Sequence, residues 1–164
     1  MIEIIKGNEE HIPAIVEMAE KTWHATYSKI LSAEQLDYML QAIYGTVTLT
    51  AVIRDGSQEF LLLKDNRGLQ GFTSFGARQE NPQIWKVHKL YILPENQGKG
   101  YGTVLIEEIK KRMREKGIRT LDLNVNRYNP AQHFYRKIGF TIIREEDVPI
   151  GRFWMNDFVM RLEI

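Results

Sequence analysis

The chain has 164 residues, enough for one domain with a single core, and we expect one domain over residues 1–164. Its composition, 43% hydrophobic and 26% charged, is usual for a soluble globular protein, and a net charge of +1 gives no field that attracts nucleic acid or an anionic membrane. The chain has no cysteine, which excludes disulfides, thiolate metal sites and a thiol nucleophile.

The start of the chain, "MIEIIKGNEE", lacks the basic segment and long apolar run of a signal peptide. We find no stretch that approaches the length of a membrane span, and we therefore expect a cytoplasmic protein with no membrane partner. The four histidines show no ligand-like spacing with carboxylates, so we expect no metal site.

The first third of the sequence predicts one strand and two helices. Residues 2–6 alternate as a strand, Asn8 is a suitable N-cap for a helix over 9–23, and Ser32 is suited to start a second helix. Residues 46–53, "TVTLTAVI", are ambiguous. Their β-branched composition favours a strand, whereas Thr46 is also suited to cap a short helix.

The remaining elements have clearer patterns. Strands are predicted over 59–63, 69–78 and 84–93, with a hairpin turn over 64–68. A helix over 101–116 has apolar residues four apart and ends at Gly117, the position of a C′ glycine. A strand over 120–125, a short helix over 129–139 and two strands over 140–145 and 153–164 complete an α+β fold with a mixed sheet.

A glycine-rich segment, "LPENQGKGYG" over 93–102, connects a strand to a helix. This layout suits phosphate binding, because the first amides of a helix lack partners and carry part of the positive end of the helix dipole. The spacing fits neither the nucleotide P-loop nor the dinucleotide fingerprint. A tight turn with a close helix–strand contact is the alternative interpretation.

Two segments in order, "LYILPENQGKGYG" and "NPAQHFYRKIGF", together resemble the GNAT superfamily of acyl-CoA-dependent N-acetyltransferases. The first segment carries a Gln-x-x-Gly-x-Gly signature, and the second a tyrosine-bearing helix; the matching residues are Gln97, Gly100, Gly102, Ala131, Phe134, Tyr135, Lys137, Gly139 and Phe140. The resemblance implies a three-layer α/β/α GNAT fold, with a mostly antiparallel mixed sheet splayed at the cofactor site and about four helices. It also favours a helix over 46–53.

The resemblance further implies acetyl-CoA as co-substrate and no metal. The pantetheine arm is expected to pair with the backbone of Tyr91 and Ile92, in the manner of an added strand. The pyrophosphate is expected on the main-chain amides of Gln97, Gly98, Lys99, Gly100, Tyr101, Gly102 and Thr103. Further cofactor contacts are expected from Asn129, Phe134, Tyr135 and Lys137, although Asn129 followed by Pro130 is also a usual helix start.

Tyr135 is the candidate general acid, because a phenol with a pKa of about 10 keeps its proton at neutral pH and can donate it to the leaving sulfur. A packed aromatic with a satisfied hydroxyl is the alternative. The amide of Ile92 is the candidate oxyanion donor. The base is open between His88, Glu80 and water, and a lone strand histidine is more often structural.

Acceptor specificity is expected from Trp23 and Tyr27, four apart on one helix face, and from Trp154 and Asp157 near the chain end. Core packing is the alternative for the aromatic residues. The stretches "TWHATY" and "MNDFVM" are similar to the polyamine-acetylating branch of the family. The carboxylates at 145–147 suit a polyamine, and a charged exposed turn explains them equally well.

The sequence therefore predicts an acetyl-CoA-dependent N-acetyltransferase acting by direct attack of a primary amine of a small molecule on the thioester, with a polyamine as one candidate. Acetylation of a protein N-terminus or lysine is the alternative within the enzyme class. A non-catalytic acyl-CoA-binding module is the alternative outside it. The acceptor and the oligomeric state, with a homodimer among the options, stay open.

Overall fold

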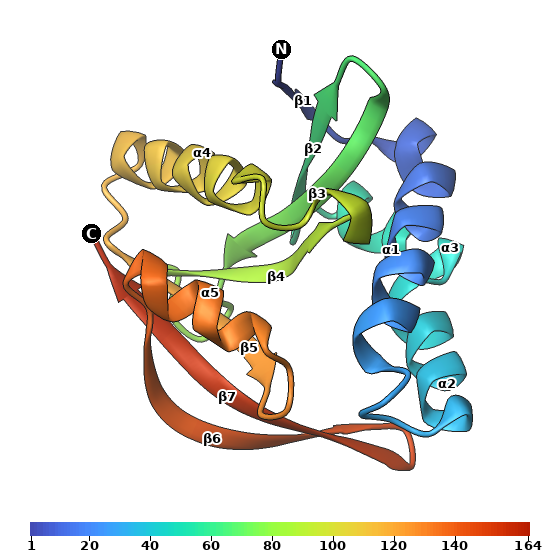
Figure 1. The fold of residues 1–164 in the computed structure, drawn as a ribbon. Helices are drawn as coiled ribbons and strands as arrows, with labels where there is room; N and C mark the ends of the chain where they lie inside the picture. Colours follow the sequence, from blue (N-terminus) through green and yellow to red (C-terminus); the bar gives the residue numbers. More distant parts are fainter.

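One seven-stranded sheet forms the centre of the protein in the computed structural model, which describes residues 1–164 (Figure 1). The strand order is β1-β2-β3-β4-β5-β7-β6, and only β4 and β5 pair in parallel. The predicted mixed, mostly antiparallel sheet is thus confirmed. The strands are β1 (Glu3–Lys6), β2 (Glu59–Asp65), β3 (Gly68–Ala77), β4 (Ile84–Ile92), β5 (Thr120–Asn126), β6 (Thr141–Ile150) and β7 (Phe153–Glu163).

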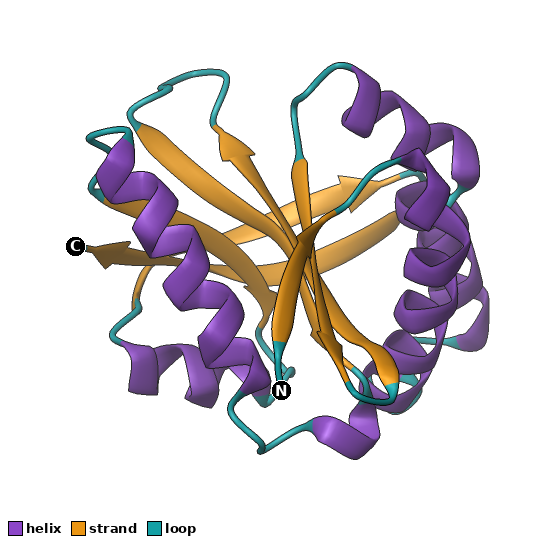
Figure 2. Ribbon diagram, turned by 90° about the horizontal axis from the view of Figure 1, so that it is seen from above, coloured by secondary structure: helices purple, strands orange, loops and turns teal.

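Helices cover both faces of this sheet, which gives the three layers seen in Figure 2. One face carries α1 (Ile12–Tyr27), α2 (Ala33–Tyr44) and α3 (Thr46–Arg54), and the other carries α4 (Tyr101–Glu115) and α5 (Ala131–Ile138). Two short 3-10 helices, Glu9–His11 and Pro94–Asn96, precede α1 and α4.

The alternation of side chains along β2 explains why the run "FLLL" is apolar without interruption. Phe60 and Leu62 belong to the apolar cluster under α1, α2 and α3, whereas Leu61 and Leu63 belong to the cluster under α4 and α5. All four are buried, with at most 1% exposed. A strand covered on both faces needs apolar residues at every position.

Residues 46–53 form a helix, in agreement with the family resemblance and against their β-branched composition. The helix begins after Gly45, without a side-chain cap from Thr46. Leu49 is fully buried in the cluster under α1, and Val52 and Ile53 pack against it. This apolar face outweighs a composition that favours strands, because packing overrides local propensity.

Two other boundaries differ from the prediction. The helix predicted from residue 9 begins as a 3-10 turn capped by Asn8, and α1 proper runs from Ile12 to Tyr27. Strand β6 continues to Ile150, five residues further than predicted. The acidic residues 145–147 therefore lie within a strand, and the turn before β7 is formed by Gly151 and Arg152.

The segment Ala33–Arg54 is, by length and composition alone, apolar enough to cross a membrane, which the sequence reading missed. In the structure it is two helices, because the backbone is extended at Gly45, with φ of −60° and ψ of 145°. Its residues Leu36, Met39 and Leu49 are buried in the apolar cluster against the sheet.

Candidate active site

The two parallel strands separate halfway along their length. β4 and β5 pair from Ile84 opposite Thr120 to Val87 opposite Leu123, and no further. On its other side β4 carries a bulge, because Val87 pairs with Phe75 and Lys89 with Ser74, which leaves His88 as the extra residue. A bulge bends its strand and increases the twist. The bulge at His88 therefore turns the end of β4 away from β5 and opens a fork between them.

The end of β4 turns backbone groups toward this fork, where the Ile92 carbonyl accepts a hydrogen bond from Gln97 Nε2 at 3.3 Å and the Ile92 amide remains available. The Leu93 amide donates to the Gln70 carbonyl at 2.9 Å, on the β3 side. Since backbone groups alternate in direction along an antiparallel pair, Tyr91 also faces β3, whereas Leu90 and Ile92 face the fork. Ile92 is thus placed as predicted. The expectation that Tyr91 offers backbone groups is wrong, because these already pair with β3.

The glycine loop has the conformation that an anion site requires. Gly98 and Gly100 both have φ of +85°, where a residue with a Cβ is strained, and a Cβ there would meet nothing within 4 Å. α4 begins at Tyr101 without a side-chain cap, so the first amides of the helix have no partner. At Gly102 a Cβ would lie 2.9 Å from Phe134 Cζ, so this glycine permits the contact between α4 and α5.

Beneath the loop lies a polar network that the sequence did not reveal. Asn96, fully buried, accepts hydrogen bonds from Arg67 Nη2 at 2.7 Å and Lys99 Nζ at 3.1 Å, and it donates to Gln70 Oε1. Asp65 accepts from Arg67 and from the Tyr101 hydroxyl, and the Arg67 hydrogen bonds hold the pKa of Asp65 well below its usual value. The network fixes the loop to the β2–β3 hairpin.

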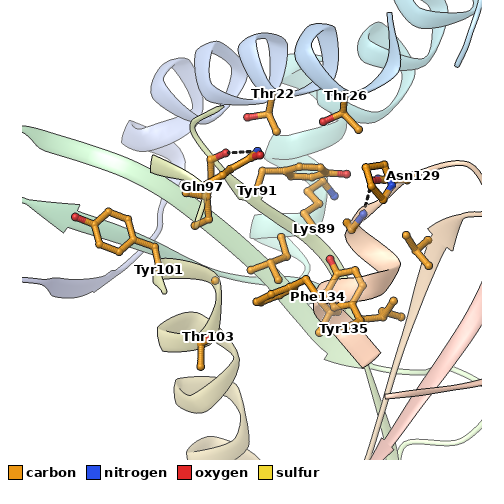
Figure 3. Close-up of a pocket in the computed structure, with 18 of the residues that line it drawn as sticks. Thr22, Thr26, Lys89, Tyr91, Gln97, Tyr101, Thr103, Asn129, Phe134 and Tyr135 are labelled. Atoms are coloured by element: carbon orange, nitrogen blue, oxygen red, sulfur yellow. Dashed lines mark hydrogen bonds between the residues drawn. The ribbon is translucent and has the colours of Figure 1, made fainter. Parts of the chain in front are cut away.

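A cleft of about 650 Å³ runs through the fork and brings most of the predicted residues together (Figure 3). Its walls come from α1, β4, the glycine loop, β5 and α5. The predicted residues that line it are Tyr27, His88, Tyr91, Ile92, Gln97, Gly98, Gly100, Tyr101, Gly102, Thr103, Asn129, Phe134 and Tyr135. Unpartnered amides at one end and free backbone groups in the fork fit a long ligand with an anionic tail.

Five predicted residues lie outside this lining. Trp23 is 3% exposed and packs on Tyr27 in the core, with ring centres 4.7 Å apart. Trp154 is 57% exposed beside α2, and Lys137 is exposed on α5. Lys99 is turned toward Asn96, and Asp157 is buried behind the cleft wall. The side-chain contacts expected for Trp23, Trp154 and Lys137 therefore disagree with their positions. The contact expected from the Lys99 main-chain amide does not depend on where its side chain points and stays a prediction.

Tyr135 has the properties of a proton donor. Its side chain is 9% exposed, and its hydroxyl points into the cleft in Figure 3. Burial, together with the nearby Tyr91, raises the pKa of Tyr135 well above 10. The phenol therefore keeps its proton at neutral pH.

Neither predicted base has the properties of one. His88 lines the cleft and remains open to solvent on one side. Although His88 is an exposed residue, loss of part of its hydration at the cleft and the positive charges of Lys86, Lys89 and Arg78 lower the pKa of His88 to about 3, so its basicity at neutral pH is weak. Glu80 follows β3, does not line the cleft, and contacts Arg78 with a side chain that is 70% exposed.

Asn129 uses both halves of its side-chain amide. Its Oδ1 accepts from the amide of Ala131, the first residue of α5, at 2.9 Å, and this helix begins two residues later than the predicted range of 129–139. Its Nδ2 donates to the Tyr27 hydroxyl at 3.2 Å. This bond ties the start of α5 to the end of α1 across the cleft, and burial keeps the pKa of Tyr27 well above 10.

Sequence reasoning missed Lys89, which lines the cleft although it is only 6% exposed. Its Nζ donates to Gln58 Oε1 at 2.7 Å and lies over the rings of Tyr44 and Phe60. Burial and the charge of Lys86 lower the pKa of Lys89 to about 8. Because side chains alternate along a strand, Lys89 points to the same face of the sheet as Tyr91, the face covered by α1. This alternation is the sequence signal that could have identified Lys89 as a residue of the cleft.

The comparison with protein families gives a match to the acetyltransferase (GNAT) domain over residues 56–142. The chain belongs to the GNAT acetyltransferase family. This GNAT enzyme is an N-acetyltransferase that uses acetyl-CoA as its co-substrate, and its glycine loop and fork supply the unpaired amides that the co-substrate needs.

The relatives of this GNAT enzyme differ in acceptor. The chain is 30% identical to spermidine N(1)-acetyltransferase of Thermoplasma acidophilum, over 86% of this chain and 89% of that protein. It is 28% identical to the [ribosomal protein bS18]-alanine N-acetyltransferase of Haemophilus influenzae, over 70% of this chain and 74% of that protein. The crystal structure of PaiA N-acetyltransferase from Thermoplasma acidophilum in complex with coenzyme A aligns with a TM-score of 0.85 at 29% identity, covering 100% of this chain and 99% of that one.

Proposed function

We propose that this enzyme transfers the acetyl group of acetyl-CoA to a primary amine of a small molecule, with a polyamine as the leading acceptor class. The observation that carries the proposal is the cleft through the fork. Tyr135 approaches it from the face of α4 and α5, and Tyr27 and Asn124 from the face of α1. The similarity to a spermidine acetyltransferase supports the polyamine class.

The residues around the fork divide the chemistry among them. Acetyl-CoA supplies a thioester, and a direct attack by the amine needs an oxyanion donor, a proton for the sulfur and an acceptor for the proton of the amine. The Ile92 amide faces the fork as the oxyanion donor, and Tyr135 holds the proton for the sulfur. Only about one alkylamine in 2,500 is neutral at pH 7, so the ammonium group must give up a proton to the bulk solvent and its buffer before the neutral amine attacks, because His88, with a pKa of about 3, does not hold that proton at neutral pH.

Acetylation of a peptide N-terminus is the second candidate, favoured by the similarity to the bS18-alanine acetyltransferase. The two candidates are separated by the release of free thiol from acetyl-CoA in the presence of either spermidine or a peptide that begins with alanine. We expect faster release with spermidine. Faster release with the peptide would refute the polyamine assignment, and no release with any primary amine would refute the whole proposal.

The Tyr135→Phe variant tests the acid within the same assay. We expect kcat to fall about 10²- to 10⁴-fold, the usual effect of losing a positioned general acid. The affinity for coenzyme A should stay within about threefold, because the ring and its packing on Phe134 and Phe140 are kept. A variant with unchanged kcat would show that Tyr135 only packs.

A further inference from the structure

Asn124 occupies a defined place at the fork. The last residue pair between β4 and β5 is Val87 with Leu123, and Asn124 is the next residue of β5. Asn124 also lines the cleft. Its neighbours Leu123 and Val125 belong to the apolar cluster under α4 and α5. Since side chains alternate along a strand, Asn124 points to the opposite face from Tyr135. An acceptor that meets Asn124 therefore reaches the fork from the side away from the acid.

The hydrogen bonds of Asn124 leave one polar atom unused. Its Nδ2 donates to Asp157 Oδ2 and to Glu146 Oε1, both at 3.2 Å. Its Oδ1 is buried and has no partner in the protein. Buried polar atoms in proteins are nearly always paired, with protein, water or ligand. The unpaired oxygen and the two carboxylates behind it are all acceptors, so the group that complements them is a donor.

Asp157 is a buried carboxylate without an ion pair. The residue is 7% exposed, and its only side-chain partner is Asn124. Arg127 is nearby but donates its Nε to the main-chain oxygen of Asp157 and its Nη2 to Asp147. Buried charges are normally paired, so a carboxylate left alone is costly unless a ligand brings the opposite charge.

The charges that face Asp157 come from several elements. Lys86 of β4 and Arg127, after β5, favour its charged form, whereas Glu146 of β6 disfavours it. The phenols of Tyr27 on α1 and Tyr91 on β4 also face it. Burial outweighs the attractive contributions and raises the pKa of Asp157 to about 6.

We propose that Asn124, backed by Asp157 and Glu146, forms the subsite that receives the positively charged amine of the acceptor. This rests on the proposed transfer of acetyl to an amine, and it deepens that function by naming a cation as the form that first binds, which gives up one proton to solvent before the neutral amine attacks the thioester. Asn124 is the contact residue. Asp157 is a positioning residue, which holds the Asn124 amide and supplies the negative charge that attracts the ammonium group.

Binding tests the subsite independently of turnover. Spermidine is titrated calorimetrically into the protein saturated with coenzyme A, at pH 7.5, for the wild type and for Asp157→Asn. We expect at least a tenfold weaker binding in the variant, with coenzyme A affinity within twofold. The matched control is Glu145→Gln, which removes one carboxylate from β6 that is 67% exposed and lies near Arg127. It should bind spermidine within twofold of wild type.

The wild type alone provides a second measurement, which stands even where Asp157→Asn does not fold. Spermidine binding should tighten about tenfold from pH 5 to pH 7, because the ionised fraction of a carboxyl with a pKa of about 6 rises by that factor. Equal binding in wild type and Asp157→Asn, a flat pH dependence, or no binding to wild type would overturn the subsite. Binding lost in Asp157→Asn, without thiol release by wild type, would support the subsite and refute the transferase function.

Discussion

The unpaired carboxylate of Asp157 makes a prediction about stability that does not involve the substrate. A carboxyl whose pKa is raised by folding holds its proton to a higher pH in the folded chain than in the unfolded chain. Folding then takes up a proton between about pH 4 and pH 6, so the free energy of unfolding falls as pH rises through this window. Above pH 6 the penalty is constant. The rise from 3.8 to about 6 corresponds to about 3 kcal/mol.

The Asp157→Asn variant removes this penalty and should therefore be more stable than wild type at neutral pH. The amide keeps an acceptor for Asn124 Nδ2, so the hydrogen bond between the two side chains is retained. Linkage gives a gain over wild type that grows by about 2 kcal/mol between pH 4.5 and pH 7.5. Urea unfolding of both proteins at the two pH values measures it.

Glu145→Gln is again the control, and its stability relative to wild type should change little over the same range because its side chain is 67% exposed. A difference between wild type and Asp157→Asn that is equal at pH 4.5 and pH 7.5 would refute the reasoning. It would mean that the folded protein tolerates the charge of Asp157 without cost, and the electrostatic basis of the acceptor subsite would be lost with it.

Three further predictions concern other parts of the structure. Gly100→Ala and Gly117→Ala both place a Cβ at positive φ without a clash, and each should lower the free energy of unfolding in urea by about 1–2 kcal/mol. Only Gly100→Ala, in the glycine loop, should also raise the KM for acetyl-CoA. An equal effect of both variants on KM would contradict the anion site. His88→Gln should leave the pH dependence of kcat/KM between pH 5 and pH 8 unchanged, since the pKa of His88 is about 3, and the loss of an inflection in this range would restore histidine as the base. Asp122→Ala should lower the free energy of unfolding by about 3–5 kcal/mol, because it leaves Arg78 and Arg161 without their buried partner. A loss below 1 kcal/mol in urea unfolding would show that water hydrates the two guanidinium groups in the variant.

The elements that the sequence predicted well are those fixed by neighbouring residues. Ser32 caps α2 by accepting from the Gln35 amide at 3.1 Å, and Gly117 takes φ of +70° after α4, both as local patterns indicate. The predictions that failed depend on distant partners. Composition alone favours a strand over residues 46–53, which are helical because Leu49 packs into a core built from other elements. β6 extends to Ile150 because β7 pairs with it there.

In the candidate site, too, the features set by neighbouring residues were predicted, and those set by distant partners were not. The glycine loop and Tyr135 were predicted because contiguous motifs carry them. The bulge at His88 was not, since it arises from the register between β3 and β4. The network around Asn96 joins residues 26 and 29 positions apart, which meet only in the folded chain. Trp154 was expected at the acceptor site from its residue type, yet it lies exposed beside α2.

Asp157 shows what a residue type cannot reveal and a folded environment can. In the sequence Asp157 is a candidate for acceptor specificity by residue type, and the carboxylates at 145–147 suit a polyamine or a charged exposed turn equally well. The structure separates them by solvation and pairing: Asp147 and Glu146 form ion pairs with Arg127 and Arg144, with carboxylate side chains that are 56% and 40% exposed, whereas Asp157 is buried and unpaired. A fold that selection improved for stability alone would place an apolar or amide side chain there. The buried carboxylate of Asp157 costs about 3 kcal/mol and lies next to an unpaired amide oxygen at the fork. The proposed binding of the acceptor cation by both groups accounts for this cost.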